Sequence, residues 1–348
     1  MVETSYQYLT KADIESPQYH DFIEEYHGKG TYRMWYRRMM WYWQRGDDTF
    51  RVFAASQEGK YVGQSCAYCV DACIDHKIIK LWWGVDAFVL SEMRGKGIGT
   101  ALQRQLLIDC PAFTSAWYSP SNGAIKRKCG AKSILDYSYT YYPVSCYFSI
   151  LLELVLKKSI SRKLSLPRVR PPYFYSRINS LKKKWRNQYN IRELEGAEIS
   201  SQAGFIASCL KENQFYVLRS EEYLRWKYND NPRMNYHLLT VYKDDKQVGL
   251  IVFSSIKDSS VVMAKGKIVK IYESLFVCNS GLTHRRLLDL VVKYWQDKGE
   301  KLDGIVSLQS MKYCPVFIYP RPHSEVLSTL NMEKITSGYI TLSDQDME

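Results

Sequence analysis

The sequence predicts an α+β fold of two tandem domains, each a mixed, mostly antiparallel sheet flanked by helices. Segments of the first half alternate as strand, two helices, three strands, helix, strand, helix, strand. Much of this order recurs in the second half. A length of 348 residues suits this arrangement, because domains usually have about 100 to 200 residues.

The elements of the first half follow from residue periodicity and turn signals. Alternating apolar residues predict strands, and apolar residues on one face at a spacing of three or four predict helices. The turn Glu58-Gly59-Lys60 joins two strand-like runs closely enough for a hairpin. The expected segments, in order, are 5–10, 16–28, 30–46, 49–57, 61–70, 81–90, 98–106, 114–119, 122–129 and 132–144.

The second half repeats the pattern of the first at a nearly constant offset. The run "ASQEGKYVG" matches "VYKDDKQVG", which sets Val62 and Gly63 against Val248 and Gly249. A duplicated fold explains this match. We predict a catalytic domain at 1–150, a basic linker at 151–187 and a degenerate copy at 188–348.

A glycine-rich loop follows the predicted strand 81–90. In "VDAFVLSEMRGKGIG", Gly95, Gly97 and Gly99 precede a helix, so backbone N–H groups and the helix dipole converge on one point. Such a point attracts phosphate. The spacing does not match a Walker loop or the dinucleotide fingerprint G-x-G-x-x-G, and antiparallel strands precede it.

The stretch "VLSEMRGKGIGTALQRQLL" resembles the coenzyme A pyrophosphate loop of the Gcn5-related N-acetyltransferases (GNAT), and the strand order is also that family's. The resemblance covers residues 1 to about 145 and implies acetyl-CoA as the acyl donor. It implies that Phe88, Val89 and Leu90 meet pantetheine, one of them through an oxyanion-stabilising N–H. The pyrophosphate would lie on Arg94, Gly95, Lys96, Gly97, Ile98, Gly99 and Thr100.

A second family signature, an Asn and Ala leading a helix, is met in part by "SNGAIKRKCGAK". The resemblance implies that Asn122 contributes to the coenzyme site. The family's general-acid tyrosine has no clear counterpart in this shorter helix. Lys126 and Cys129 occupy its neighbourhood, and Tyr118, assigned to the preceding strand, is the substitute candidate.

Asp86 is the candidate general base. Transfer of an acyl group to an amine requires removal of a proton from the ammonium, and Asp86 is the carboxylate on the strand that enters the loop. It shares a face with Phe88 and Leu90. A purely structural role for this carboxylate is the equally weighted alternative.

Composition and charge limit the remaining possibilities. The nine Cys are scattered, an apolar stretch long enough for a membrane span is missing, and the start lacks a secretory pattern, which favours a cytoplasmic protein. Cys66 and Cys69 lie in a predicted strand on opposite faces, and the six His are isolated, so no metal site is predicted.

The net charge of +12 is concentrated in one segment, because residues 157–186 contain eleven Lys and Arg and no Asp or Glu. A solvated charge run is the simplest interpretation. Peripheral contact with anionic membranes is the alternative, and a nucleic-acid partner is less favoured.

These observations predict an acetyl-CoA-dependent N-acyltransferase that acetylates a primary amine, preferably an amino sugar on a nucleotide or lipid carrier. Aromatic and basic residues in 32–45 suggest that acceptor, although aromatic rings at helical spacing are more often core. The alternatives are a non-catalytic CoA-binding regulatory module and an aminoacyl or peptidoglycan-type transferase. The second half either borders the acceptor cleft or merely completes a core or a dimer.

Overall fold

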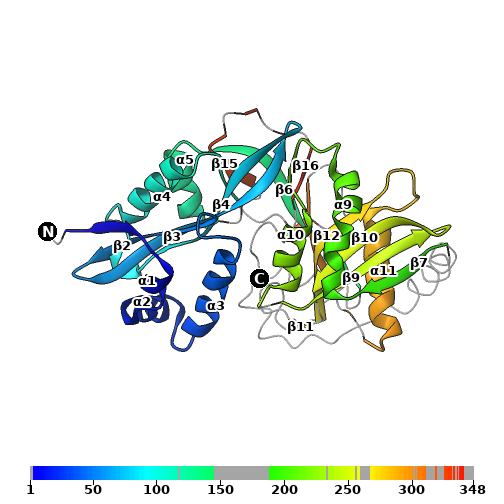
Figure 1. Ribbon diagram of the computed structural model, residues 1–348, viewed down its shortest axis with the longest axis horizontal. Coiled ribbons are helices and arrows are strands. Elements are labelled where there is room, and N and C mark those ends of the chain that lie inside the picture. Colours follow the sequence, from blue (N-terminus) through cyan, green and yellow to red (C-terminus); the bar gives the residue numbers. More distant parts are fainter. Residues whose placement is uncertain are drawn as a thin grey trace.

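The computed structural model has two lobes that follow the two halves of the sequence (Figure 1). The first lobe carries the N-terminal strands and helices α1 to α5, and the second carries α9 to α11. The residues that the structure describes are 3–116, 118–144, 188–232, 234–254, 257–258, 267–300, 302, 304–310, 318–319, 325–330, 332–333, 335 and 337–340.

The first lobe is built on a mixed sheet in which β1 to β4 form antiparallel neighbours and β4 and β5 run parallel. Helices α2 and α3 lie between the first two strands in sequence, and α4 and α5 flank β5. The elements are β1 (Ser5–Tyr8), α1 (Lys11–Ile14), α2 (Pro17–His27), α3 (Tyr32–Trp43), β2 (Phe50–Gln57), β3 (Lys60–Ile74), β4 (Lys77–Val89), η1 (Ser91–Met93), α4 (Ile98–Asp109), β5 (Phe113–Ser115), α5 (Pro120–Lys128) and β6 (Lys132–Pro143).

The second lobe repeats this plan. Strands β7, β9, β10 and β12 form antiparallel pairs, and β12 and β13 run parallel. Its elements are β7 (Asn190–Leu194), η2 (Gly196–Gln202), α9 (Ala203–Leu210), β8 (Phe215–Val217), α10 (Glu221–Leu224), η3 (Arg225–Asn229), β9 (Tyr236–Lys243), β10 (Lys246–Ser254), β11 (Lys257–Asp258), β12 (Lys267–Phe276), α11 (His284–Asp297) and β13 (Gly304–Ser310).

Equivalent hydrogen bonds show that the two lobes are copies of one fold. The Leu90 N–H donates to the Val62 carbonyl at 3.0 Å, and the Val277 N–H donates to the Val248 carbonyl at 2.9 Å. Val62 and Val248 are the residues that the sequence repeat aligns. The predicted α+β fold of tandem, mostly antiparallel sheets is confirmed.

Strands from the end of the chain join the two sheets. β15 (Glu325–Ser328) lies between β5 and β6, and β13 pairs with β6. β14 (Ile318–Tyr319) also pairs with β6, and β16 (Gly338–Tyr339) pairs with β8, which in turn pairs with β3. The C-terminal segment therefore completes the first sheet, while the division at 150 and 188 stays a prediction.

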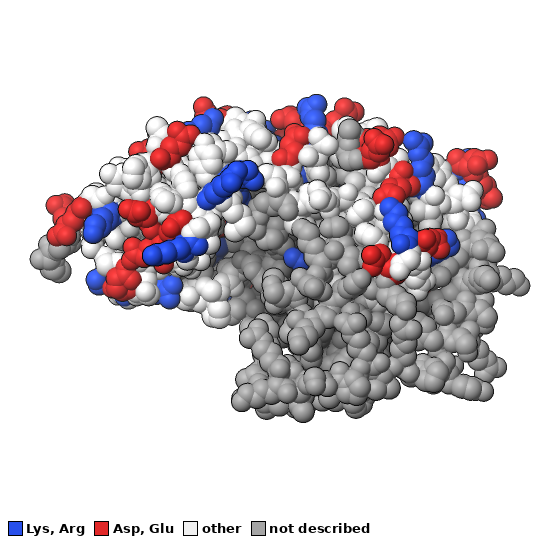
Figure 2. Space-filling view, turned by 90° about the horizontal axis from the view of Figure 1, so that it is seen from below, with Lys and Arg blue, Asp and Glu red and all other residues white. Residues whose placement is uncertain are grey.

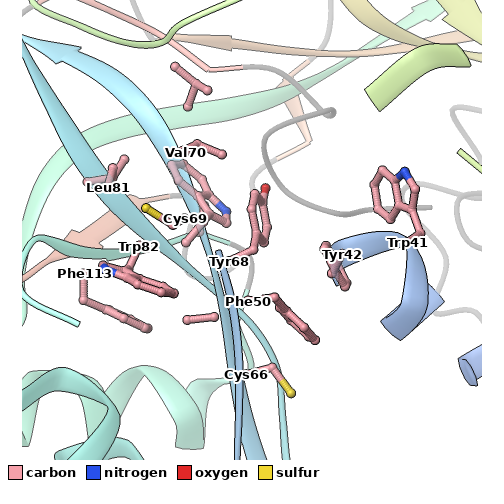
Figure 3. Packing of buried hydrophobic residues seen from close by; sticks show 14 of the residues in the cluster. Trp41, Tyr42, Phe50, Cys66, Tyr68, Cys69, Val70, Leu81, Trp82 and Phe113 are labelled. Atoms are coloured by element: carbon pink, nitrogen blue, oxygen red, sulfur yellow. The ribbon is translucent and has the colours of Figure 1, made fainter. Parts of the chain in front are cut away.

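Helix α3 supplies core residues rather than a surface platform of rings. Trp35, Trp41, Tyr42 and Trp43 are at most 6% exposed, and Figure 3 shows Trp41 and Tyr42 among the packed side chains. Trp41 stacks on Trp226 of the second lobe at 4.4 Å, and each indole N–H donates to the other's carbonyl. The aromatic content of this helix therefore joins the lobes.

One predicted strand is shorter than expected, and one helix of the second lobe changes its type along its length. Tyr118 lies beyond β5, which ends at Ser115, because Ser119 caps α5 and Pro120 is preorganised for its first position. The run around Tyr223 begins as α-helix, but a π-helical turn, Arg225–Asn229, follows. The helix propensities of the residues do not distinguish an α-helix from a π-helical turn.

Surface charge is mixed where the structure describes it. Figure 2 shows Lys and Arg side chains interspersed with Asp and Glu over both lobes. The basic segment 157–186 lies outside the described residues.

Among the helices of the described ranges, none has the length and hydropathy needed to span a membrane. These ranges also contain no group of three potential metal-ligating side chains, and Cys66 and Cys69 are both buried free thiols.

Candidate functional site

The glycine loop connects the end of β4 with the start of α4. Gly95 and Gly97 have φ angles of +81° and +83°, a left-handed conformation that glycine adopts without a steric penalty. Gly97 is the N-cap of α4 and provides no side-chain cap. The helix therefore begins with its N–H groups uncovered.

Consecutive N–H groups of this loop are available to a ligand. Within the described residues, the amides from Gly95 to Thr100 donate no hydrogen bond to the protein. Six neighbouring donors at a helix N-terminus form a site for an anion. The exposed side chains of Arg94 and Lys96 flank the loop and add positive charge. Arg94 donates from Nε to the Val89 carbonyl at 3.1 Å.

The strands on either side of the loop separate next to it. β4 and β5 pair only at Trp82 with Phe113 and at Trp83 with Thr114. β4 continues to Val89, so its last six residues have no pairing with β5. A gap between parallel strands exposes backbone donors and acceptors that an extended chain can use.

Val89 offers its amide to this gap. Leu90 donates its N–H to Val62 on β3, and N–H groups point alternately to the two sides of a strand. The Val89 N–H therefore faces the side of β5. By the same alternation the Phe88 N–H faces β3. Of the three predicted pantetheine contacts, Val89 presents a backbone donor in the gap.

A β-bulge places Asp86 beside α3. The register between β3 and β4 shifts between Gln64 and Cys66, and Asp86 has a φ of +49°, a conformation that Asp tolerates better than most residues. Bulges redirect side chains next to active sites. Arg38 of α3 lies 3.2 Å from Asp86 Oδ1, and both side chains are nearly buried. Oδ2 has no hydrogen-bond partner among the described residues.

A chain of buried hydrogen bonds supports the bulge. The Trp35 indole donates to Tyr19 Oη at 3.2 Å, and Tyr19 donates to Gln64 Oε1 at 2.7 Å. Gln64 Nε2 lies 3.4 Å from the Asp86 carbonyl. Buried polar groups with satisfied partners hold one conformation. This network therefore orients Asp86 from α2, α3 and β3.

The ring of Phe88 packs in an aromatic cluster with α2 and α3. It stacks on Tyr26 at 3.9 Å and on Phe22 at 5.3 Å, and His27 and Trp35 meet it edge-on. Burial lowers the pKa of His27, with Asp86 opposing and Arg38 reinforcing the shift. His27 is therefore a neutral, accessible proton acceptor close to Asp86 at pH 7.

Tyr118 and Asn122 lie at the start of α5. The Asn122 N–H donates to Ser119 Oγ at 3.2 Å. Tyr118 is 9% exposed and packs on Gly123, where an added Cβ would come within 2.4 Å of its ring. Burial, followed by the charge of Glu325, raises the pKa of the Tyr118 hydroxyl. This hydroxyl holds its proton tightly.

The equivalent region of the second lobe is closed by its own side chains. Thr283 caps α11 by accepting from the Arg286 N–H, and Arg286 donates to the Gly281 carbonyl. Tyr189 Oη donates to the Ser280 carbonyl at 3.1 Å. Of the amides that correspond to the uncovered ones before α4, those of Leu282 and Arg286 are thus bonded to side chains before α11.

Glu273 occupies the position equivalent to Asp86, four residues before the matched amide of Val277. It is fully buried and pairs with Arg219 at 2.7 Å. Tyr228 and Tyr339 donate to its two oxygens at 2.6 and 2.8 Å. The second copy therefore has a closed carboxylate network where the first has a buried carboxylate oxygen without a hydrogen-bond partner among the described residues.

The comparisons with known proteins agree with this arrangement. Residues 16–120 match the acetyltransferase (GNAT) family, a match that includes α2, α3, β4, the glycine loop and α4. The first half of the chain thus carries a region that matches the GNAT acetyltransferases. The predicted family resemblance is confirmed. No curated protein matches the chain in sequence.

Solved structures of similar fold cover nearly the whole chain. A GCN5-related N-acetyltransferase from Anabaena variabilis has a TM-score of 0.57 and 13% identity over 94% of this chain and 72% of that one. A protein of Enterococcus faecalis V583, described as a "Probable N-Acyltransferase", has a TM-score of 0.59 and 11% identity over the same shares.

A tandem GNAT protein from the clavulanic acid biosynthesis pathway resembles this chain over nearly its full length. Its TM-score is 0.55 at 12% identity, over 94% of this chain and 97% of that one. At these identities the likeness concerns the fold, and it extends to the pairing of two GNAT-like units in one chain.

Three side chains of the site do not stand out in the sequence. His27 and Arg38 belong to helices with no chemical motif, and only the packing of α2 and α3 on β4 brings them to Asp86. The sequence placed Lys126 near the missing tyrosine, but nothing in the sequence indicated that its side chain is 3% exposed.

Proposed function

We propose that this protein is an acetyl-CoA-dependent N-acetyltransferase that acetylates a primary amine. The observation that carries the proposal is the row of unbonded amides from Gly95 to Thr100 beside the separation of β4 and β5. The amides suit a pyrophosphate, and the gap suits the extended pantetheine arm. The two features adjoin at Val89, so one molecule can occupy both.

The residues around the gap suit attack of an amine on a thioester. The Val89 N–H would stabilise the oxygen that gains charge when the carbonyl is attacked. Oδ2 of Asp86 is buried and has no hydrogen-bond partner among the described residues, and it would take up the proton of the acceptor ammonium through a water molecule. Arg38 balances the charge of Asp86 through Oδ1 and does not bond Oδ2.

Among amines, an amino sugar on a nucleotide or lipid carrier stays our preferred acceptor. The support now comes from Tyr26 and His27, which are exposed beside Phe88, because most rings of α3 belong to the core. Exposed aromatic faces next to a carboxylate suit a sugar that carries an ammonium group. Small amines and peptide lysines are the competing acceptors.

Thiol release from acetyl-CoA with a panel of amines tests the activity. We expect release to depend on the amine, and to be fastest with amino sugars. Coenzyme A binding is measured separately by calorimetry. Binding without release for every amine would favour the CoA-binding regulatory module, and absence of binding would contradict the proposal.

Replacing Gly97 by Ala is expected to weaken coenzyme A binding at least tenfold, about 1.4 kcal/mol. Alanine is strained at a φ of +83°, so the loop must rearrange and its amides lose their common direction. Isothermal titration calorimetry with CoA provides the dissociation constant.

Gly59→Ala is the matched control for this variant. Gly59 has a φ of +74° in the turn between β2 and β3, and like Gly97 it has open space around its Cβ position. Both variants should lose similar thermal stability. Equal loss of CoA affinity in both variants would mean that the effect is global and that the loop is not the binding site.

A further inference from the structure

Lys126 is a buried lysine on the coenzyme side of the first lobe. Its side chain is 3% exposed, and no carboxylate of the described residues forms an ion pair with it. Nζ lies 2.5 Å from Ser115 Oγ, and the rings of Phe113 and Tyr118 lie 5.7 and 5.3 Å from it. An amine in such surroundings is costly to bury, which indicates a role beyond packing.

The position of Nζ relates to the gap between the strands. Ser115 follows Thr114, the last residue of β5 that pairs with β4. On the helix side, Ile125 contacts Gly99 of the loop, where Cδ1 lies 3.5 Å from the Cβ position. Helix α5 therefore lies beside the first turn of α4, and Lys126 extends from α5 to Ser115, next to the point at which β4 and β5 part.

We propose that Lys126 donates the proton that the coenzyme A sulfur takes up when the amine displaces it. This inference rests on the proposed acetyl transfer. The N–C bond forms, the C–S bond breaks, and the Nζ–H proton passes to the thiolate. Lys126 is left neutral on Ser115, and it regains a proton from solvent, which also receives the proton lost by the acceptor ammonium.

The protonation energetics agree with this geometry. Burial lowers the pKa of Lys126 from 10.5 to about 7, whereas an ordinary thiol has a pKa of about 8.5. Transfer of the proton from the Lys126 ammonium to the thiolate is therefore favourable in free energy. The other titratable groups on this side are Tyr118, Arg127 and Glu325. Tyr118 is the weaker acid because its pKa is raised.

Lys126→Met tests the inference with two readouts. We expect kcat to fall about 100-fold, the usual order for loss of a general acid, while the KM for acetyl-CoA changes less than about twofold. The second readout is the titration of the lysine ammonium in the CoA-bound protein, followed by NMR. The wild type should show one lysine with a pKa of about 7 whose deprotonation also lowers kcat as pH rises, and Lys126→Met should lack both the titration and this fall in kcat.

Methionine fills the same space without a buried amine, so the variant should fold with an unchanged or higher Tm. Lys128→Met, an exposed position of the same helix, is the control and should alter neither readout. A kcat and a pH dependence of kcat that are identical in the wild type and Lys126→Met would overturn the role of Lys126. Failure of the wild type to bind CoA would instead overturn the proposed function.

Discussion

Replacing Asp86 by Asn is expected to lower kcat by about 10²- to 10³-fold, the range for loss of a general base, and to leave the CoA dissociation constant unchanged. The side-chain amide of Asn cannot accept the ammonium proton. The backbone N–H groups of the loop and of Val89, which are proposed to bind CoA, do not depend on the side chain at position 86. Asparagine also tolerates the φ of +49° at this bulge. Thiol-release kinetics and calorimetry with CoA check the two expectations.

The control Asp71→Asn shows whether the loss of kcat is specific to Asp86. Asp71→Asn on β3 removes an exposed carboxylate that pairs with Lys80 at 2.9 Å, and its kcat should stay within about twofold of the wild type, since exposed pairs contribute little. Equal loss of kcat and CoA binding in Asp86→Asn would show a structural role for this carboxylate.

His27→Gln separates the second proton acceptor from the first. Burial lowers the pKa of His27 from 6.5, so its neutral form is present above that lowered pKa and lost as pH falls through it. A larger fall in kcat for His27→Gln than for Asp86→Asn, together with loss of the acid limb of the pH profile, would assign the base to His27.

Replacing Glu273 by Ala is expected to destabilise the protein by about 3–5 kcal/mol, the usual cost of breaking a buried ion pair. The variant leaves Arg219 charged with its side chain 1% exposed. Burial, followed by the charge of Glu273, raises the pKa of Tyr228 and of Tyr339, so both hydroxyls stay protonated and lose their acceptor. Urea denaturation provides the change in unfolding free energy.

Replacing both partners should recover most of this loss, because Arg219→Met with Glu273→Leu leaves no unpaired charge. Asp297→Ala is the surface control, since it removes an exposed pair with Lys293 and should cost at most about 0.5 kcal/mol. CoA affinity should be unchanged in Glu273→Ala when it is folded. Loss of affinity at a temperature where the variant is folded would contradict a degenerate second copy.

Local sequence signals predicted the features that depend on neighbouring residues. The strand, the turn with Gly95 and Gly97, and the helix after it are contiguous, so their residue types alone indicate the loop. The repeat was also readable, because Val62 and Val248 precede glycines that lie against leucines of the following helices. A Cβ at either position would crowd these leucines, which favours glycine in both copies.

Contacts between distant segments could not be predicted in the same way. The strand assignment placed Tyr118 within β5, but the cap at Ser119 begins α5 just after it. No local pattern indicates that β15, more than 180 residues after β6, enters the first sheet between β5 and β6. Pairing partners of a strand depend on the whole chain, because every strand carries the same backbone groups.

The sequence by itself thus determined a duplicated α+β fold and one glycine loop before a helix, since both follow from short-range periodicity and glycine spacing. Only the tertiary structure decided the state of the charged groups. It pairs Asp86 with Arg38 through Oδ1, buries Oδ2 without a hydrogen-bond partner among the described residues, closes Glu273 in a buried network, and buries Lys126 beside Ser115. The physical reason is that burial and partners, which arise from packing across the chain, set the charge and reactivity of a titratable side chain.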